Sequence, residues 1–361
     1  MLIFLEDLAA MDKVFKPIIV LNLDCNLACT YCFEGQRKGK HYLSERTADK
    51  LLAFVRDHGV PGREEINVTF YGGEPLLSLN RMVSLAEGIG ALAAAAGIPF
   101  SFSLITNGTL LTHTNVEILR PLGLRSASVT LDGPRETHDI ARPYRSGTGS
   151  YDAILANLRA VHDLVDLQIG GNYTRENWRE FPCLLDDLAA NGLTPMVISN
   201  VKFDPVVRER EGIALPDFHG GCTSINEPWI FEVSVFLREE ILRRGYRTPR
   251  ITPAICMIDF PEQIVIDYDG SVYKCSGLIG RKEYRIGDLD QGQGLTDVRR
   301  IHDLDIWKNE NCLACSYLPL CFGGCRYLNL LRTGDLAGLD CRKPYFDAVL
   351  EKLVVQDLLA R

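Results

Sequence analysis

The first two-thirds of the chain alternates two hydrophobic periodicities. Short runs rich in β-branched and aromatic residues predict six strands, at residues 18–23, 66–70, 100–106, 126–131, 167–173 and 195–201. Apolar residues at helical spacing predict five helices between them, at residues 45–58, 81–96, 115–122, 151–164 and 177–191. We expect Ser44 to cap the first helix and Gly192 to end the last one.

Strand and helix in strict alternation predict a parallel sheet with right-handed crossovers. Six units are too few for a closed eight-stranded barrel. We therefore predict an α/β fold in which a partial (β/α)6 TIM-like barrel is open on one side.

The pattern changes beyond residue 205. Residues 203–222 read as a loop and residues 228–244 as a bridging helix. Residues 263–274 predict a β-hairpin with Asp269-Gly270 as its turn, and residues 343–360 predict an amphipathic helix. We divide the chain into a barrel over residues 1–205, a bridging region over 206–250 and a carboxyl-terminal domain over 251–361.

Composition and charge exclude several classes of protein. The 361 residues are 46% hydrophobic and 24% charged, as in ordinary globular proteins, and the net charge of -8 argues against a nucleic-acid partner. The amino terminus has no basic region before its short apolar run, and no stretch is long enough to span a membrane. Twelve cysteines in such a chain favour metal binding in a reducing cytoplasm over disulfides.

Three cysteines follow the first predicted strand with the spacing Cys25-x3-Cys29-x2-Cys32. A tetrahedral zinc takes four ligands, whereas an iron–sulfur cubane held by three thiolates keeps one iron open for a small molecule. Active sites of such barrels form at the carboxyl ends of the strands, where Cys25 falls. Spacing alone leaves a partial zinc site or unrelated core thiols as alternatives.

This run resembles the signature of the radical S-adenosylmethionine (radical SAM) enzymes. The resemblance implies a [4Fe–4S] cluster that binds S-adenosylmethionine. One electron then breaks the sulfonium bond, and the resulting 5′-deoxyadenosyl radical removes a hydrogen atom from the substrate. The cofactor carries the chemistry, while the protein positions the substrate and excludes water.

Further barrel segments resemble the cofactor-binding segments of this family. Gly72-Gly73-Glu74 follows the second strand, and the resemblance implies that it holds the methionine amino group; a structural turn is the alternative. Arg142 is the implied partner of the methionine carboxylate, or else a solvated loop charge. The remaining implied contacts are Tyr31, Asn107 and Thr130.

Seven later cysteines resemble, in every spacing, the SPASM domain of radical SAM peptide maturases. The resemblance implies two auxiliary [4Fe–4S] clusters, and so three clusters in the chain. The outer one would be held by Cys312, Cys315, Cys321 and Cys341, and the inner one by Cys256, Cys275 and Cys325. One or two structural zincs in a ribbon-like domain are the alternative.

The chain departs from the sulfatase-maturing relatives at two positions. Glu262 stands where they have an additional cysteine, and Ser276 stands where they place a catalytic Asp. The inner cluster is then expected to keep an open iron, unless Cys222 or a carboxylate such as Asp259 completes it. We expect Cys183, in a helical stretch, to be a core residue.

The resemblance points to short maturases of the geopeptide type. It implies a peptide substrate, an anaerobic cytoplasm and a reductase, flavodoxin or ferredoxin as electron donor. Only 24 residues precede Cys25, too few for a leader-binding domain, so leader recognition, if needed, is expected from a separate protein or from the surfaces of the barrel and the SPASM domain. Thioether formation is the favoured reaction. Formylglycine formation, or a non-catalytic metal-binding scaffold, is the alternative.

Overall fold

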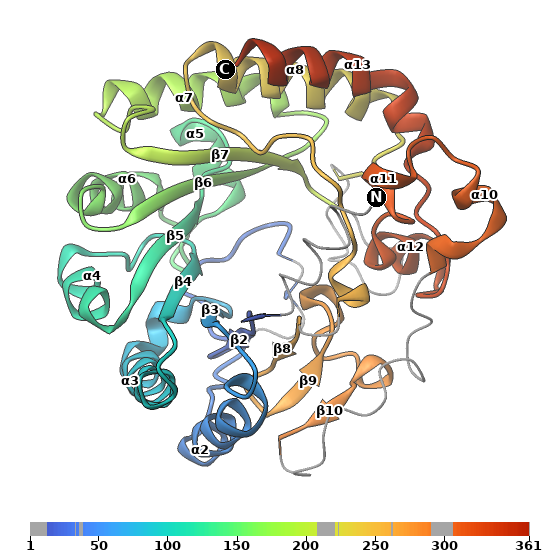
Figure 1. Ribbon diagram of the computed structural model, residues 1–361. Coiled ribbons are helices and arrows are strands. Elements are labelled where there is room, and N and C mark those ends of the chain that lie inside the picture. Colours follow the sequence, from blue (N-terminus) through green and yellow to red (C-terminus); the bar gives the residue numbers. More distant parts are fainter. Residues whose placement is uncertain are drawn as a thin grey trace.

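The computed structural model describes residues 13–32, 34–35, 39–207, 221–222, 224–260, 263–289 and 306–360. One ten-stranded sheet organises these residues, in the order β10-β9-β8-β2-β3-β4-β5-β6-β7, with β1 (Val14–Phe15) paired beside β3. Its curved central part and the helices on its outer face are seen in Figure 1.

The six predicted barrel strands are present and run parallel to their neighbours. They are β2 (Ile18–Val20), β3 (Glu65–Tyr71), β4 (Phe100–Thr106), β5 (Leu124–Thr130), β6 (Asp166–Tyr173) and β7 (Ile198–Pro205). The last strand was expected at 195–201, which is wrong by several residues. Thr194 begins a turn in which its carbonyl accepts from the N–H groups of Val197 and Ile198, both at 3.0 Å, so the strand starts only after that turn.

The predicted helices cover the outer face of the sheet (Figure 1). They are α2 (Glu45–Phe54), α3 (Leu79–Ala96), α4 (His113–Leu119), α6 (Tyr151–Val161) and α7 (Phe181–Ala190). The Ser44 hydroxyl caps α2 by accepting from Thr47 N at 3.0 Å, and Gly192 follows α7 at φ +82°. A further helix, α5 (Arg135–Ala141), was not predicted. Cys183 is exposed on α7, so its prediction as a core residue is wrong.

The two faces of the barrel strands differ in chemistry. Ile66, Val68 and Phe70 of β3 are buried in the main core against the helices. Residues on the opposite face are polar and half-buried, and Asn67 Nδ2 donates to Ser101 Oγ across β3 and β4 at 3.1 Å. A polar inner face suits a barrel that is open to a substrate rather than packed shut.

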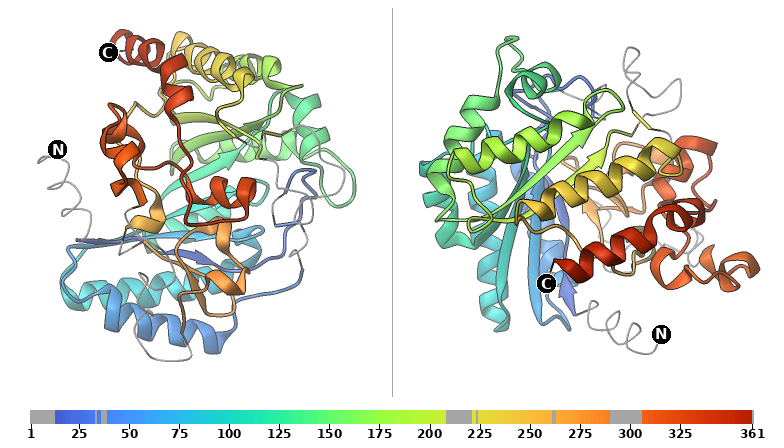
Figure 2. Two further views of the ribbon diagram at one scale, coloured as in Figure 1. Left: turned by 90° about the vertical axis from the view of Figure 1, so that its right-hand side faces the viewer. Right: turned by 90° about the horizontal axis from the view of Figure 1, so that it is seen from above.

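The carboxyl-terminal part extends the same sheet. The hairpin of β8 (Val265–Ile266) and β9 (Ser271–Tyr273) forms as predicted, with Gly270 at φ +92°, and β8 pairs in parallel with β2. The predicted bridging helix is α8 (Pro228–Arg243), and the predicted closing helix, α13 (Lys343–Leu359), lies beside it (Figure 2). The remaining elements are β10 (Gly287–Asp288), α10 (Glu310–Leu313), α11 (Leu318–Cys321) and α12 (Arg326–Thr333).

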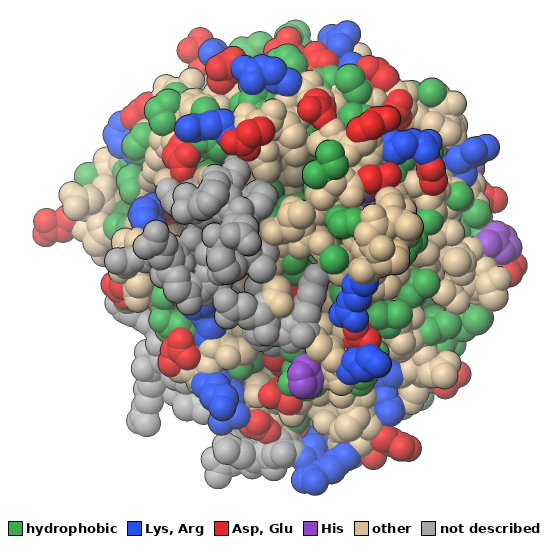
Figure 3. All heavy atoms as spheres, turned by 180° about the vertical axis from the view of Figure 1, so that it is seen from behind, with side chains coloured by type: hydrophobic (Ala, Val, Ile, Leu, Met, Phe, Trp, Pro, Cys, Tyr) green, Lys and Arg blue, Asp and Glu red, His purple; other side chains and the backbone are tan. Residues whose placement is uncertain are grey.

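Single short helical turns join several of these elements. They are η1 (Val55–Gly59), η2 (Pro75–Ser78), η3 (Arg120–Leu122), η4 (Trp178–Glu180), η5 (Met257–Asp259), η6 (Ser276–Leu278), η7 (Lys282–Tyr284) and η8 (Ile306–Lys308). On the face shown in Figure 3, acidic and basic side chains are interspersed. Within the described ranges, no helix has the length and apolar character needed to cross a bilayer.

Candidate active site and cysteine centres

The amino-terminal cysteine loop leaves β2 and lies against the segment after α5. Ala28 N donates to Pro143 O at 2.8 Å, and Thr30 N donates to Ala141 O at 3.0 Å. These two bonds bring the three cysteines next to Arg142, which lies far away in the sequence. Cys25 is buried, whereas Cys29 and Cys32 are partly exposed.

Polar groups surround Cys25. Its sulfur accepts from Leu27 N at 3.4 Å and from Asn107 Nδ2 at 3.7 Å. Its N–H donates to Asp24 Oδ1 at 3.0 Å, and the same oxygen lies 3.0 Å from Arg145. Burial raises the pKa of Asp24, but the Tyr42 hydroxyl and Arg145 outweigh burial and lower it. The predicted contact Asn107 is thus beside the loop.

Gly72 and Gly73 are required by the backbone of the segment that follows β2. A Cβ on Gly72 would lie 2.5 Å from Asn22 O, and one on Gly73 would lie 2.2 Å from Asp24 O. Gly73 N donates to Asn22 O at 3.0 Å. Only glycine permits this approach. The pair therefore fixes the end of β3 against the strand that carries the cysteine loop, and its predicted cofactor contact stays a prediction.

The Glu74 carboxylate is fully buried and satisfied by protein donors. It accepts from Leu76 N at 3.0 Å, from Thr106 Oγ1 at 2.8 Å and from Asn107 N at 2.8 Å. Burial raises the pKa of this carboxyl, and the three donors offset part of the rise. Glu74 thus ties the ends of β3 and β4 together, a role that the sequence did not show. Its predicted contact with an ammonium group stays a prediction.

Arg142 lies in a buried network with Tyr31 and Asp132. Its side chain is 11% exposed and lies 3.6 Å from Asp132, which is fully buried, so the alternative of a solvated loop charge is wrong. It donates to the Tyr31 hydroxyl at 2.6 Å, and that hydroxyl in turn donates to Asp132. Burial lowers the pKa of Arg142, but Tyr31, Cys29 and Asp132 together raise it well above its ordinary value. Burial also raises the pKa of Tyr31 well above its ordinary value.

His138 supports this network through hydrogen bonds, and it was not predicted from the sequence. Its Nδ1 accepts from Asp132 N at 3.2 Å, and its Nε2 lies 3.0 Å from Ser150 Oγ. Ser150 Oγ donates to Arg142 O at 2.7 Å, so Nε2 carries the proton. Burial, with a contribution from Arg142, lowers the pKa of His138 to about 3. The signal available in the sequence was a histidine one helical turn before Arg142.

These residues fit the cofactor that the signature implies. The loop offers three thiols, and a buried cation lies beside Cys29. Arg142 Nε has no hydrogen-bond acceptor among the described residues, so it can donate to a carboxylate. Thr130 ends β5 half-buried on the inner face. No three Cys, His, Asp or Glu side chains of the described ranges stand in metal-binding geometry, so the cluster assignments rest on spacing and surroundings.

The three inner cysteines lie together. Burial raises the pKa of Cys275 to about 12, and the charges of Cys256 and Cys325 add to the rise. Backbone N–H groups of Gly277 and Leu278 point at Cys275, and those of Arg326 and Ile258 point at Cys256. Amides aimed at sulfur stabilise thiolate ligands of an iron–sulfur cluster.

Two of the outer cysteines, Cys315 and Cys321, lie near residues 341–343. Burial raises the pKa of Cys321, and the Cys341 charge adds to this, whereas the Arg342 N–H donates to the Cys321 sulfur and lowers it. The hydrogen bond to Asp347 raises the pKa of Lys343, and the Cys315 charge adds a smaller part to the rise. Cys312 sits on α10, where its N–H donates to the capping Asn309 Oδ1 at 3.0 Å.

Cys222 lies elsewhere, in an apolar cluster with Tyr173, Trp178 and Ile230. Burial raises its pKa to about 12, and the nearby charges are Glu227 and Asp340 rather than an inner cysteine. The structure therefore does not group Cys222 with the inner set. Glu262 lies outside the described residues.

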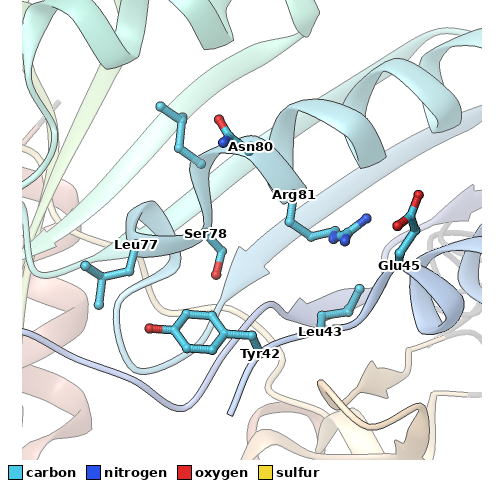
Figure 4. A pocket seen from close by; sticks show the side chains of 8 residues that line it. Tyr42, Leu43, Glu45, Leu77, Ser78, Asn80 and Arg81 are labelled. Carbon is cyan, nitrogen blue, oxygen red and sulfur yellow. The ribbon is translucent and has the colours of Figure 1, made fainter. Parts of the chain in front are cut away.

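A pocket of about 500 Å³ lies between the first turns of α2 and α3. Leu77 and Tyr42 lie at one end of its lining, and Arg81 and Glu45 lie at the other (Figure 4). Of the lining residues in the described ranges, none is a predicted cofactor contact.

Comparisons with known proteins concern the domain that carries this site. Residues 19–188 match the model of the Radical SAM superfamily. The chain is 26% identical over 337 residues to the serine-type anaerobic sulfatase-maturating enzyme of Klebsiella aerogenes, covering 87% of this chain and 80% of that enzyme. The chain therefore contains a radical SAM domain and is an enzyme that acts by radical chemistry. This family implies a [4Fe–4S] cluster and S-adenosylmethionine.

Two solved structures share the fold. Native anSMEcpe with bound AdoMet and Kp18Cys peptide has a TM-score of 0.73 at 19% identity, covering 95% of this chain and 99% of that one. Streptococcus suis SuiB bound to precursor peptide SuiA has a TM-score of 0.63 at 16% identity, covering 93% and 77%. The predicted partial barrel is confirmed, and the alternative of a non-catalytic scaffold is wrong.

Proposed function

We propose that this enzyme modifies a ribosomally made peptide after translation, and that it uses three [4Fe–4S] clusters. Thioether formation is our first choice of reaction. Support comes from sulfatase-maturating relatives that match most of the chain, and from the shared fold with enzymes solved with bound peptides.

The proposal rests mainly on one apolar cluster, because this cluster contacts both the strand before the amino-terminal cysteine loop and the inner cysteines. Val20 of β2 and Leu23, two residues before Cys25, are buried in it, and Cys256 and Cys275 pack against it. The inner cysteines thus lie beside the strand that ends in the cysteine loop. A peptide held on the polar inner face would have the radical source on one side and the inner cluster on the other.

The protein's own residues have separable tasks in this scheme. The bound cofactor supplies a carbon radical that removes a hydrogen atom from the peptide. Arg142 binds the methionine carboxylate, and Tyr31, Asp132 and His138 hold its guanidinium in place. The inner site orients the peptide thiolate. When the C–S bond forms, the thiol proton would leave to solvent, and a cluster held by Cys256, Cys275 and Cys325 would take up the released electron.

Formylglycine formation on a protein is the second candidate, because the relatives that match most of the chain are sulfatase-maturating enzymes. Against it stands Ser276, which begins the η6 turn directly after Cys275. A serine hydroxyl is a far weaker base at neutral pH than the aspartate that those relatives place there.

The experiment incubates the anaerobically reconstituted enzyme with S-adenosylmethionine, a chemical reductant and short Cys-containing peptides encoded near its gene. Loss of two hydrogen atoms, together with loss of one alkylatable thiol, supports a thioether. An aldehyde that reacts with a hydrazide supports formylglycine. If the activity of the enzyme does not depend on the peptide and no peptide residue is altered, both candidate reactions are contradicted.

The remaining partners follow from the same scheme. A reductase, flavodoxin or ferredoxin would supply the electron, and peptide recognition would fall to a separate leader-binding protein or to the surfaces of the barrel and the carboxyl-terminal domain. Reduction assays with each carrier protein, in place of the chemical reductant, identify the donor.

A further inference from the structure

Arg326 carries a buried positive charge beside the inner cysteines. It begins α12 directly after Cys325, and its side chain is 1% exposed. Within the described part of the chain, Nε, Nη1 and Nη2 have no hydrogen-bond acceptor. Asp259 balances the charge of this guanidinium but, at 3.7 Å, accepts no hydrogen bond from it, and unsatisfied buried donors are costly, so this position favours a further group that accepts hydrogen bonds.

The surroundings of Arg326 show where that group lies. Its backbone N–H donates to the sulfur of Cys256. Its Nη1 lies 3.7 Å from Oδ1 of Asp259, whose side chain is 4% exposed and which ends the turn after Cys256. The Asp259 charge also acts on Cys256. The guanidinium is therefore held between the two segments that carry Cys256 and Cys325.

We propose that Arg326 is a positioning residue for the inner auxiliary cluster, that its guanidinium donates hydrogen bonds to the cluster's sulfur atoms, and that Asp259 orients it as a counter-ion. A three-thiolate cluster is an anion whose sulfides and thiolates accept such bonds. This inference rests on the inner cluster of the proposed function.

The consequence is a tuned reduction potential. A nearby cation and N–H···S bonds favour the more reduced, more negative cluster, and a nearby carboxylate opposes it. Arg326 therefore raises the potential of the inner cluster, and Asp259 lowers it.

A purely structural ion pair is the competing account, and it makes a different prediction. If the pair is only structural, removing Arg326 and removing Asp259 would destabilise the same part of the protein in the same direction. A tuning pair instead shifts the potential in opposite directions when Arg326 or Asp259 is neutralised.

The test is an EPR-monitored redox titration, with iron counts, of the full chain carrying Ala at Cys25, Cys29 and Cys32. Only auxiliary clusters then contribute. Arg326→Met should make reduction of one cluster about tenfold less favourable, or about 59 mV for a one-electron couple. Asp259→Asn should shift the same cluster the other way. Arg326→Lys, which keeps the charge without the planar fork, should fall between Arg326→Met and the parent.

The matched control is Arg238→Met, which breaks a partly buried Arg–Asp pair between α8 and α13, and should leave both potentials unchanged. Unchanged potentials in Arg326→Met at full iron content would overturn the inference. If Arg326→Met does not load iron, Asp259→Asn decides: a raised potential supports the inference, and an unchanged or lowered one overturns it. Absence of iron from the parent triple variant would instead overturn the proposed function.

Discussion

The two cysteine regions are built in different ways. The amino-terminal loop is fastened to the ends of parallel strands, with Glu74 tying β3 to β4 and Asn107 reaching Cys25. The carboxyl-terminal cysteines lie on turns and on helices as short as the four residues of α10 and α11. Four-residue helices have little stability of their own. We infer that the barrel site is formed before any cofactor binds. The folding of the carboxyl-terminal region instead depends on what its cysteines bind.

Iron removal should separate the two regions most clearly. Chelation of iron should raise hydrogen exchange at residues 306–342, since cluster binding there contributes folding free energy. The buried strands β3 to β6 should stay protected. Hydrogen exchange with mass spectrometry on holo and chelated protein measures this, and equal loss of protection in both regions would contradict it.

Glu74→Ala should be the most destabilising single change on the barrel side. It leaves the N–H groups of Leu76 and Asn107 and the Thr106 hydroxyl without their acceptor. Unsatisfied buried donors cost about 1–3 kcal/mol each, so we expect a loss of roughly 3 kcal/mol in unfolding free energy. Glu64→Ala, an exposed control paired with Lys13, should change it by less than about 1 kcal/mol. If Glu74→Ala lowers the unfolding free energy no more than this control does, Glu74 does not hold the ends of β3 and β4 together.

Arg142→Ala should weaken S-adenosylmethionine binding by about tenfold to a hundredfold, because a hydrogen bond to a charged group contributes about 1.5–3 kcal/mol. Isothermal titration with the reconstituted enzyme measures the dissociation constant. Arg135→Ala, at an exposed pair with Asp152, serves as the control. An unchanged constant in Arg142→Ala would remove this residue from the cofactor site.

His138 should make the barrel side sensitive to mild acid. Its folded pKa of about 3 lies below the ordinary 6.5, so below pH 6.5 the unfolded imidazole takes up a proton that the folded one does not. Unfolding free energy should therefore fall by about 1.4 kcal/mol between pH 7.5 and pH 5.5 on this account. His138→Asn should lose that part of the pH dependence in chemical denaturation. An identical pH profile in the variant would assign the sensitivity to other groups.

The sequence predicted the repetitive part of this molecule well, because strand and helix patterns repeat through the barrel. It missed links between distant segments. Nothing near Arg142 indicated that residues 141 and 143 would bond the cysteine loop, or that Asp132 and Tyr31 would bury the guanidinium. Gly72 and Gly73 were identified, but the reason for them is the close approach of the backbone that follows β2. Arg326 gave no periodic signal, since its importance comes from burial between cysteine segments.

The most direct test of the account is the replacement of Cys25, Cys29 and Cys32 by Ala, followed by anaerobic reconstitution, iron analysis and assay of 5′-deoxyadenosine. Three four-iron clusters give about twelve irons in the parent enzyme, and we predict that roughly eight remain in the variant. No 5′-deoxyadenosine should form. If the variant makes 5′-deoxyadenosine at the parent rate, or if replacing these three cysteines removes all iron, the division into one catalytic and two auxiliary centres is contradicted.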